Sequence, residues 1–450
     1  MKDHNIKIPK YVENALKILE SYNHEAYLVG GCIRDSLLNI EPNDWDICTS
    51  AFPKEICEVF NFYGYKTIDT GLKHGTVTVI MKDNQKFYNL EITTYRTDGE
   101  YEDNRHPKQV RFVKSLKQDL ARRDFTINAL AYNPKTGLVD CFGGQRDIED
   151  KIIQAVGNPN ERIREDALRI LRGLRFSSKY GFEIESSLSL YIHKYSRLLK
   201  RISVERIQNE FNGILMGKYS FKVLSKYRDI ISEFIPEIRD MFGFEQNNPY
   251  HHLDVWEHTL LSVEEAKTDL VIKLSMFFHD IGKPSTYTED KVQNTHFFGH
   301  AARSVEITET VLKRLKYPNE IISEVLTLIE YHNSYMTEKN IIKLMRELGD
   351  KKTGMLIDVI NADIKAQNPK YKGDWDNELT ALRRRYEKIT EENLCYRISD
   401  LNINGNDLID LGLSGKAIGE TLEKILDKVI LDDIPNQHDE LVKCAKLLVE

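Results

Sequence analysis

The chain has 450 residues, a length that suggests about three domains of ordinary size. Its 41% of hydrophobic residues supplies enough apolar side chains for buried cores, and no apolar run approaches the roughly 20 residues that span a bilayer. The six cysteines are scattered without a CxxC pair, which argues against a disulfide framework or a zinc ribbon. The N-terminus lacks the apolar core of a signal peptide. We therefore expect a cytoplasmic protein with no membrane partner.

A formal net charge of −7 argues at first against a nucleic-acid partner, but the charges are unevenly distributed. Residues 151–230 hold 16 Lys and Arg against 8 Asp and Glu, whereas residues 391–450 hold 6 against 13. A basic middle region can form a face that meets phosphates. A solvated helical surface explains the same charges equally well.

Residues 24–140 alternate short β-rich runs with helical stretches, which predicts an α+β domain with a small, mostly antiparallel sheet. The β-rich runs are AYLVGG, WDIC, GTVTVIM, FYNLEITTYR, KQVRFV and LVDCFGG. From about residue 147 onward the patterns are helical, beginning with a helix through 163–174 that Gly181 ends. A break at 245–254 and a linker at 370–378 divide the helical part. The C-terminal region reads as helix–turn–helix, with turns expected at Gly405, Gly412, Gly415 and Gly419.

Two aspartates stand two residues apart in NDWDIC, at the edge of an apolar stretch. Alternate side chains of a strand point to the same face, so Asp44 and Asp46 are predicted to lie side by side, with Trp45 and Ile47 turned away. Adjacent carboxylates repel each other unless a cation lies between them, and Mg²⁺ brought with substrate phosphates removes that repulsion. On its own, such a pair is more often a turn or a helix cap.

The segment YLVGGCIRD, upstream of the aspartates, reads as a strand, a Gly-Gly turn and a helix. Gly30 and Gly31 let backbone N–H groups approach a phosphate, and Arg34 offers a forked donor. Glu91, on a later strand, is a candidate third carboxylate for two-metal phosphoryl transfer. This order of elements is the layout of a nucleotidyltransferase palm.

Seven segments carry a resemblance to a known family: VGGCIRD, NDWDICTSA, HGTV, EITTYRTDGEYEDNRHP, DLARRDFTINALAYN, DCFGGQRDIEDK and REDALRILRGLRF. In this order they resemble the bacterial class II tRNA nucleotidyltransferases and poly(A) polymerases, of which CCA-adding enzymes are the best-known members. The resemblance is dense over roughly 24–215 and looser beyond. It implies an α+β fold in which a palm is followed by an all-α neck, an HD-type body and a tail. We place the head at 1–145, the neck at 146–245, the body at 246–375 and a tRNA-binding tail at 376–450.

The segment REDALRILRGLRF suggests how a base is chosen. Asp166 and Arg169 are three residues apart, so on one helix they share a face. A carboxylate beside a guanidinium accepts from an amine and donates to a ring nitrogen, which matches cytosine and adenine and mismatches guanine and uracil. In isolation, a surface ion pair between the two is the simpler interpretation. The resemblance implies that this EDxxR motif acts as an amino-acid template.

The resemblance implies further contacts with the nucleotide. Arg172 and Arg175 align with arginines that contact it, Arg123 with one that contacts the triphosphate, and Asn128 with a residue near the sugar. Asp124 either caps a helix over TINALA or acts as a ligand. A loop comparable with 97–107 helps relatives switch from C to A, and its presence here favours an enzyme able to add A.

A second group of metal-ligating residue types lies between residues 250 and 370. His279 and Asp280 are adjacent in an apolar stretch, with His258 upstream and Asp363 downstream, and this pattern resembles the HD superfamily of phosphohydrolases. His and Asp together suit a divalent transition metal or Mg²⁺. The candidates for a second metal position, as in dinuclear members, are His300 and His332. A lone buried histidine is more often a hydrogen-bonded core residue, and binding a metal does not by itself mean turnover.

The resemblance implies a CCA-adding tRNA nucleotidyltransferase in which Mg²⁺ on Asp44 and Asp46 activates the tRNA 3′-hydroxyl for attack on CTP or ATP. Gly31, Arg34 and Arg123 would hold the triphosphate. An A-adding or CC-adding enzyme and a poly(A) polymerase share these motifs, although the acidic tail argues against the last. Alternatives from other classes are an HD phosphohydrolase acting on RNA ends and an RNA-binding scaffold with both sites inactive. The sequence predicts no oligomeric state.

Overall fold

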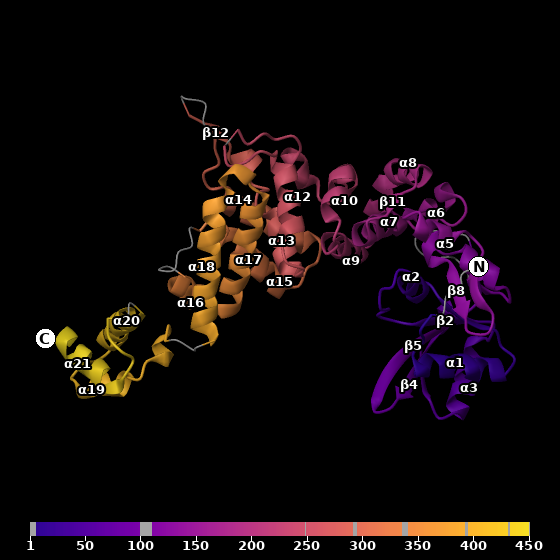
Figure 1. The fold of residues 1–450 in the computed structure, drawn as a ribbon, viewed down its shortest axis with the longest axis horizontal. Helices are drawn as coiled ribbons and strands as arrows, with labels where there is room; N and C mark the ends of the chain where they lie inside the picture. The colour runs from indigo at the N-terminus through magenta and orange to yellow at the C-terminus, as the bar shows by residue number, and fades with distance from the viewer. Residues whose placement is uncertain are drawn as a thin grey trace. The chain divides into compact units, whose positions relative to one another are not determined.

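The computed structural model describes residues 6–99, 110–247, 249–290, 295–334, 341–391, 395–430 and 433–449. The chain divides into two compact units, Met1–Pro236 and Glu237–Glu450. The first unit combines a sheet with helices, and the described part of the second is helical apart from one short strand pair (Figure 1). The predicted α+β class is therefore confirmed. The finer division into head, neck, body and tail stays a prediction.

A seven-stranded sheet forms the first half of the first unit, in the order β3–β4–β5–β2–β1–β8–β9. Its strands are β1 (Ala26–Val29), β2 (Asp46–Thr49), β3 (Lys66–Gly71), β4 (Thr76–Asp83), β5 (Lys86–Thr94), β8 (Leu130–Asn133) and β9 (Gly137–Asp140). All neighbours are antiparallel except β2 and β5, which run parallel. The sheet is thus mostly antiparallel, as predicted.

Side-chain periodicity explains how this sheet is covered. Along β4, Val77, Val79 and Met81 are fully buried while the residues between them are half-buried, which is the alternation of a strand with one face toward a core. The helices α1 (Lys10–Ser21) and α3 (Pro53–Phe62) pack against this strand. The buried face of α1 has apolar residues at helical spacing, Val12, Ala15, Leu16, Ile18 and Leu19.

Short helices and strand pairs complete the first unit. They are α2 (Gly31–Leu37), β6 (Arg96–Asp98) with β7 (Val110–Phe112), α4 (Leu116–Ala121), α5 (Gly144–Glu149), β10 (Ile152–Ile153) with β11 (Glu183–Ile184), α6 (Pro159–Glu165), α7 (Leu168–Tyr180), α8 (Ser186–Tyr195), α9 (Val204–Leu215), α10 (Ser220–Lys226) and α11 (Arg228–Ile231). Gly181 ends α7 in the left-handed region with φ of 74°, as predicted. The helix expected through 163–174 is broken, because α6 ends before Asp166 and α7 begins after it.

Two segments of this unit, TINALA and the loop 97–107, were predicted as a helix and a loop. The helix expected over TINALA is wrong: Thr126–Asn128 forms a single 3₁₀ turn and Leu130–Asn133 is strand β8, which pairs with β1 and β9. The apolar run LAY reads equally well as a helix or a strand, and pairing inside the sheet decides for the strand. Most of the predicted loop 97–107 lies outside the described residues, and its start is part of β6.

The second unit is built from packed helices (Figure 1). These are α12 (Val255–Glu265), α13 (Leu270–Phe278), α14 (His300–Arg314), α15 (Asn319–Tyr331), α16 (Ile341–Leu348), α17 (Asp350–Ala366), α18 (Lys372–Glu391), α19 (Gly405–Asp410), α20 (Lys416–Ile430) and α21 (His438–Val449), with β12 (Thr288–Glu289) paired to β13 (Thr295–His296). Helix α17 contacts α12, α13 and α15, and Trp256, Phe277 and Phe278 are buried among these helices.

Two predictions for this unit fail. The linker expected at 370–378 is wrong, because most of it belongs to α18, where the long helix packs on α17. Gly412 and Gly415 lie in the predicted turn of the C-terminal region with positive φ, but Gly405 begins α19 and Gly419 lies inside α20. A glycine marks a turn only where the backbone needs its freedom.

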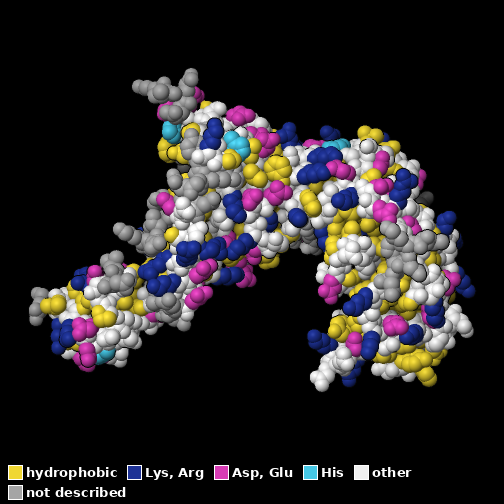
Figure 2. Space-filling view, in the orientation of Figure 1, with side chains coloured by type: hydrophobic (Ala, Val, Ile, Leu, Met, Phe, Trp, Pro, Cys, Tyr) yellow, Lys and Arg dark blue, Asp and Glu magenta, His cyan; other side chains and the backbone are white. Residues whose placement is uncertain are grey.

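The visible surface carries mixed charge (Figure 2). Lys and Arg side chains gather over the region of α16 to α18 in the second unit. Among the described residues, no helix combines the length and apolar character that crossing a membrane requires.

Candidate active site

Three carboxylates gather where β2 begins. Asp46 is the first residue of β2 and lies opposite Glu91 of β5, because these two strands run parallel in that register. Asp44 is exposed and precedes the strand, while Trp45 and Ile47 are buried. The alternation expected for a strand therefore extends from Asp44 to Ile47, although only Asp46 and Ile47 of this stretch belong to β2.

Burial and two neighbouring carboxylates disfavour the ionisation of Asp46. Burial, followed by the charges of Asp44 and Glu91, raises the pKa of Asp46 to about 6, and Arg123 opposes this rise. A carboxyl group in this position gains most from a nearby cation. Oxygen ligands held this closely fit Mg²⁺, which binds proteins through one or two carboxylates together with substrate phosphates.

The Gly-Gly turn brings Arg123 and Arg34 to the same region. Gly30 has φ of 79°, and a Cβ atom there would lie 2.9 Å from Nη1 of Arg123. Only glycine fits this close approach without strain. In α2, Nε of Arg34 donates to Oδ1 of Asp35 at 2.9 Å, and Nη1 donates to Oδ1 of Asn128. The guanidinium is therefore oriented by two partners.

Asp124 connects the 3₁₀ turn to α7. Its Oδ1 accepts from the Phe125 N–H at 2.8 Å and from Nδ2 of Asn128 at 3.0 Å, and its Oδ2 accepts from Nε of Arg172 at 2.7 Å. Burial alone would raise the pKa of Asp124, but Arg172, the Asn128 amide and Arg169 lower it well below its usual value. The helix-cap interpretation is wrong, since Phe125 holds the cap position of the turn.

This pair makes a prediction for stability. We expect Asp124→Asn to lower the free energy of unfolding at pH 7 by roughly 1–3 kcal/mol, because the half-buried guanidinium of Arg172 loses the charge of its closest carboxylate. A carboxyl with a lowered pKa stabilises the fold above the ordinary aspartate pKa, and that contribution disappears as the pH falls through the lowered value. Denaturant unfolding at pH 7 and near pH 3 should show a smaller difference in acid. An equal difference at both values would contradict the assignment.

Asp166 and Arg169 do not share a helix. Asp166 has an extended backbone with φ of −137° and ψ of 103°. Its Oδ1 accepts from the Leu168 N–H at 3.0 Å, and its Oδ2 accepts from Nη2 of Arg206 at 2.7 Å. The prediction of one helix face is wrong because the Asp166 carboxylate turns back onto the first N–H of α7, an interaction that aspartate prefers at a helix start.

Arg169 is anchored by other partners. Its Nη1 donates to Glu165 at 2.8 Å and to the Arg162 carbonyl at 3.1 Å, and its Nη2 donates to the Arg122 carbonyl at 3.0 Å. Among the described residues, the ion pairs of Asp166 and Arg169 are with Arg206 and Glu165. The simple surface ion pair between Asp166 and Arg169 is therefore not formed, and each side chain is fixed independently.

One cavity of about 660 Å³ within the first unit brings these residues together. Its lining includes both aspartates and all the nucleotide-contacting residues that were predicted: Gly30, Gly31, Arg34, Asp44, Asp46, Arg123, Asp166, Arg169, Arg172 and Arg175. Glu91 is absent from the lining given by the described residues, and its proximity rests on its pairing with Asp46.

Motif reading missed several residues of this cavity: Asn43, Leu168, Phe176, Lys179 and Arg206. Phe176 and Lys179 follow Arg172 at helical spacing on α7, so the periodicity of that helix was an available signal. Arg206 lies on α9 and has no such signal, because only the packing of α9 on α7 places it beside Asp166.

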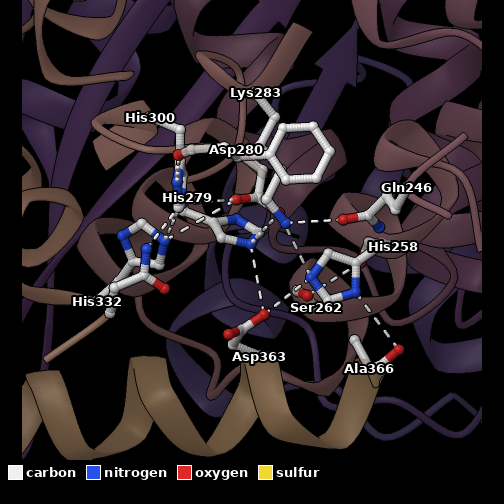
Figure 3. A network of polar contacts seen from close by, with 12 residues as sticks. Gln246, His258, Ser262, His279, Asp280, Lys283, His300, His332, Asp363 and Ala366 are labelled. Carbon is white, nitrogen blue, oxygen red and sulfur yellow. Dashed lines mark hydrogen bonds and ion pairs between the residues drawn. The ribbon is translucent and has the colours of Figure 1, made fainter. Parts of the chain in front are cut away.

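A second cluster of ionisable side chains lies within the helical unit (Figure 3). One group contains His258, His279 and Asp363, and another contains Asp280, His300 and His332; in each, the ligand atoms lie within 4.8 Å of one another. These residues come from α12, the end of α13, α14, the end of α15 and α17. The four residues predicted from the HD pattern are thus brought together, with both additional histidines.

Hydrogen bonds orient the histidines of this cluster. In His279, His300 and His332, Nδ1 lies 2.6–2.8 Å from the carbonyl oxygen three residues earlier in the chain. A proton on Nδ1 leaves Nε2 free to face the cluster, the usual arrangement of metal-binding histidines. Burial lowers the pKa of His332 to about 4, which favours the neutral ring that ligation needs.

The centre of the cluster has unsatisfied polar atoms. Both carboxylate oxygens of Asp280 and Nε2 of His279 are buried without a hydrogen bond of proper geometry among the described residues, although Nζ of Lys283 lies 2.7 Å from Oδ2. Burial alone would lower the pKa of His279, but Asp280 and Asp363 raise it to about 10. Mixed imidazole and carboxylate donors with unmet polar atoms fit a divalent metal, whose binding would displace a proton.

Comparison with known proteins first gives the class. Residues 26–154 match the sequence family of the poly A polymerase head domain, and residues 181–241 match the probable RNA and SrmB-binding site of polymerase A. Residues 293–445 match tRNA nucleotidyltransferase domain 2. The protein is therefore a nucleotidyltransferase.

Full-length relatives narrow this class. The chain is 34% identical to the CCA-adding enzyme of Ligilactobacillus salivarius over 98% of both chains, and 33% identical to that of Bacillus velezensis over 92% of both. It also matches the crystal structure of the Bacillus stearothermophilus CCA-adding enzyme in complex with CTP, with a TM-score of 0.69, 26% identity and 98% of each chain covered. The chain belongs to the family of CCA-adding enzymes, and this membership implies the use of a divalent metal.

Proposed function

We propose that the chain adds C, C and A to the 3′ end of tRNA from CTP and ATP, without a nucleic-acid template and with release of pyrophosphate. One observation carries the proposal. The carboxylates suited to phosphoryl transfer and the Asp166 and Arg169 side chains suited to reading a base line the same cavity. A single bound nucleotide can therefore meet both.

Asp44 and Asp46 would hold the metal, with Mg²⁺ as the ion that these oxygen ligands favour and Glu91 as a candidate third ligand. Bound there, Mg²⁺ supplies activation of the tRNA 3′-hydroxyl and charge neutralisation at the α-phosphate. The parallel pairing of β2 with β5 fixes Asp46 beside Glu91 on the sheet. Because rigid strands carry these carboxylates, little reorganisation is needed when the substrate binds.

The basic wall of the cavity would bind the triphosphate. The Gly30–Gly31 turn leaves room for close approach, and Arg34 and Arg123 lie beside it. Arg172 and Arg175 extend this wall along α7, each paired to a carboxylate, Asp124 and Glu210. Forked guanidinium groups suit phosphate oxygens, and the paired carboxylates keep the arginines in place before the nucleotide arrives.

Base choice would rest on Asp166 and Arg169. Each Asp166 oxygen accepts one hydrogen bond from the protein and has a second lone pair for an exocyclic amine. Arg169 uses its two Nη atoms in bonds to the protein and has further N–H groups for a ring nitrogen. A pair fixed in this way accepts C and A and leaves G and U with mismatched donors and acceptors.

The experiment that tests this function uses three tRNA transcripts that end before CCA, after CC, and after the complete CCA. Each is incubated with CTP and ATP together, one of the two labelled, and the products are resolved to single nucleotides. We expect C, C and A on the first, one A on the second and no further addition to the third. Long A tracts, or C addition without A, would instead point to a poly(A) polymerase or a CC-adding enzyme.

For tRNA contact, the second unit offers a basic stretch on α18 as well as the predicted tail. Arg383, Arg384, Arg385 and Lys388 lie on this helix. On the visible face, Lys and Arg side chains gather over the region of α16 to α18 (Figure 2). Arg383 is paired with Asp358, and Arg384 is exposed. Cationic side chains of this kind bind phosphates without sequence preference, as a substrate shared by all tRNAs requires.

The helical cluster supports a second candidate function, a metal-dependent phosphohydrolase that acts on RNA ends. The observation that favours it is that two ligand groups adjoin at Asp280, whose Oδ2 lies 3.1 Å from Nε2 of His279 and 3.6 Å from Nε2 of His258. His258, His279 and Asp363 would hold one divalent ion, and Asp280, His300 and His332 a second. The buried oxygens of Asp280 that lack hydrogen bonds suit this role.

After loading with excess Zn²⁺ or Mn²⁺ and dialysis, we expect the full chain to retain bound metal. Asp280→Asn should bind the metal at least about tenfold more weakly, because one carboxylate charge is removed. Elemental analysis measures the retained metal, and hydrolysis of bis(p-nitrophenyl) phosphate measures turnover separately. Glu306→Gln, on the exposed surface of α14, is the matched control. CCA addition should be unchanged in both variants, and equal metal content in all three proteins would disprove this site.

A further inference from the structure

Arg34 is held by residues that lie far apart in the sequence. On its edge, the guanidinium donates to Asp35 at 2.9 Å and to Asn128. On its faces, the guanidinium carbon lies 4.9 Å from the ring centroids of both Phe176 and Tyr180. Arg34 belongs to α2 and the two rings belong to α7, so this contact joins the Gly-Gly turn to the helix that follows Asp166.

Tyr180 has a second connection to this arrangement. Its hydroxyl donates to Oδ1 of Asp35 at 2.7 Å, the same oxygen that accepts from Nε of Arg34. Asp35 is only 6% exposed, so its carboxylate depends on protein donors rather than on water. Tyr180 thus touches Arg34 directly through its ring and indirectly through its hydroxyl. We call Arg34, Asp35, Phe176 and Tyr180 the clasp.

Three positively charged arginine side chains lie around the Phe176 ring of the clasp. Three guanidinium groups, from Arg34, Arg172 and Arg175, lie 4.9, 5.5 and 4.6 Å from the centroid of the single Phe176 ring. Like charges this close repel each other, although the ring face attracts each of them. Each arginine has a carboxylate within 2.9 Å, namely Asp35 for Arg34, Asp124 for Arg172 and Glu210 for Arg175, and Glu210 also lies 3.7 Å from Arg172. Any loosening of one ion pair therefore frees a guanidinium to move away from the others.

We propose that Tyr180 is a positioning residue for nucleotide binding: its hydroxyl fixes Asp35, which in turn holds the Arg34 guanidinium at the cavity wall where a triphosphate is bound. This inference rests on the proposed role of Arg34 toward the triphosphate. It concerns the affinity for the triphosphate and not the choice of base, because Asp166 and Arg169 have other hydrogen-bond partners. A purely structural role would need the stacked ring of Tyr180 but not its hydroxyl.

The test is Tyr180→Phe, which keeps the ring and removes only the hydroxyl. We expect the KM for CTP and the KM for ATP to rise by the same factor, roughly 5- to 20-fold, because one hydrogen bond to a buried charged group is lost. The kcat should stay within about twofold and the preference for C and A over G and U should be unchanged, since uniform binding is what the variant loses. Tyr195→Phe is the matched control: its hydroxyl donates to Asn160 at 2.6 Å, and neither residue lines the cavity as described.

A double-mutant cycle with Arg34→Lys shows whether Tyr180 acts through Arg34. We expect Arg34→Lys to raise both KM values, and Tyr180→Phe to add little in that background, because contacting residues couple. If Arg34→Lys leaves KM unchanged, the proposed role of Arg34 in the function is overturned. If Arg34→Lys raises KM and Tyr180→Phe does not, or only lowers the Tm, the clasp is overturned as a positioning device. Additive effects of the two changes would also overturn it.

Discussion

Asp46→Asn is expected to lower the rate of nucleotide transfer by about 1,000-fold or more while tRNA binding stays nearly unchanged. The side chain keeps its size but loses the charge that, in the proposed site, would help Asp44 and Glu91 to hold a metal. The pKa of Asp46, raised to about 6 by burial and by these two carboxylates, shows that the position is electrostatically strained without a cation. Asparagine relieves that strain, so the variant should fold well. Single-turnover incorporation of labelled CTP measures the rate.

A metal readout separates this effect from misfolding. If the proposed site holds Mg²⁺, the ion should raise the Tm of the parent protein, because only the folded chain brings the carboxylates together, and it should raise that of Asp46→Asn much less. Glu41→Gln, an exposed carboxylate that precedes NDWD and lies outside the cavity lining, is the matched control. Transfer that stays within about tenfold of the parent in Asp46→Asn would rule out Asp46 as a carboxylate needed for the chemistry.

The catalytic end of the cavity could be predicted from sequence because it depends on short-range rules. Strand alternation alone places Asp44 and Asp46 on one side and buries Trp45 and Ile47. Glu91 was proposed only as a residue of a later strand. Its partner could not be derived, because the parallel pairing of β2 with β5 is a long-range feature that no local pattern encodes.

The part of the cavity lined by Asp166 and Arg169 shows the limit of helical periodicity as a predictor. Spacing predicted one helix face for Asp166 and Arg169, but aspartate competes for the backbone N–H groups of a helix start, and here that competition breaks the helix. Both residues line the cavity, but the helix face predicted for them is wrong, and their role in base choice stays a prediction. Arg206, which forms an ion pair with Asp166, lies on a different helix. The sequence did not point to it because, like the pairing of β2 with β5, this contact is long-range and no local pattern encodes it.

The cluster of histidines and aspartates in the helical unit could be predicted only in part from the sequence. The adjacency of His279 and Asp280 and the general HD pattern were visible in the sequence. That His300 and His332 approach to 3.3 Å between their Nε2 atoms depends on how α14 packs on α15. The TINALA segment and the 370–378 stretch were misassigned because tertiary packing, in the sheet and on α17, outweighed their local propensities.

Asp166→Ala is expected to weaken the discrimination of CTP and ATP against GTP and UTP by about 5- to 150-fold, which corresponds to the roughly 1–3 kcal/mol of one well-formed base contact. Removing the carboxylate removes the acceptor for the exocyclic amine of cytosine and adenine, and it also removes the feature that repels the carbonyl oxygen of guanine and uracil. The ratio of kcat/KM values for the four nucleotides on a tRNA ending before CCA measures this discrimination.

The same substitution also removes a helix-start bond and the partner of Arg206, so stability must be measured beside selectivity. Loss of a capping side chain costs about 1 kcal/mol and should act on all four nucleotides alike. Glu161→Gln, an exposed carboxylate on the preceding helix α6, controls for the loss of charge. If Asp166→Ala lowers kcat/KM for all four nucleotides by the same factor, Asp166 supports the fold of the cavity and does not read the base. A change in the ratio, with the Tm lowered no more than by the loss of a helix-start bond, would support contact between Asp166 and the base edge, where an amine and a carbonyl differ.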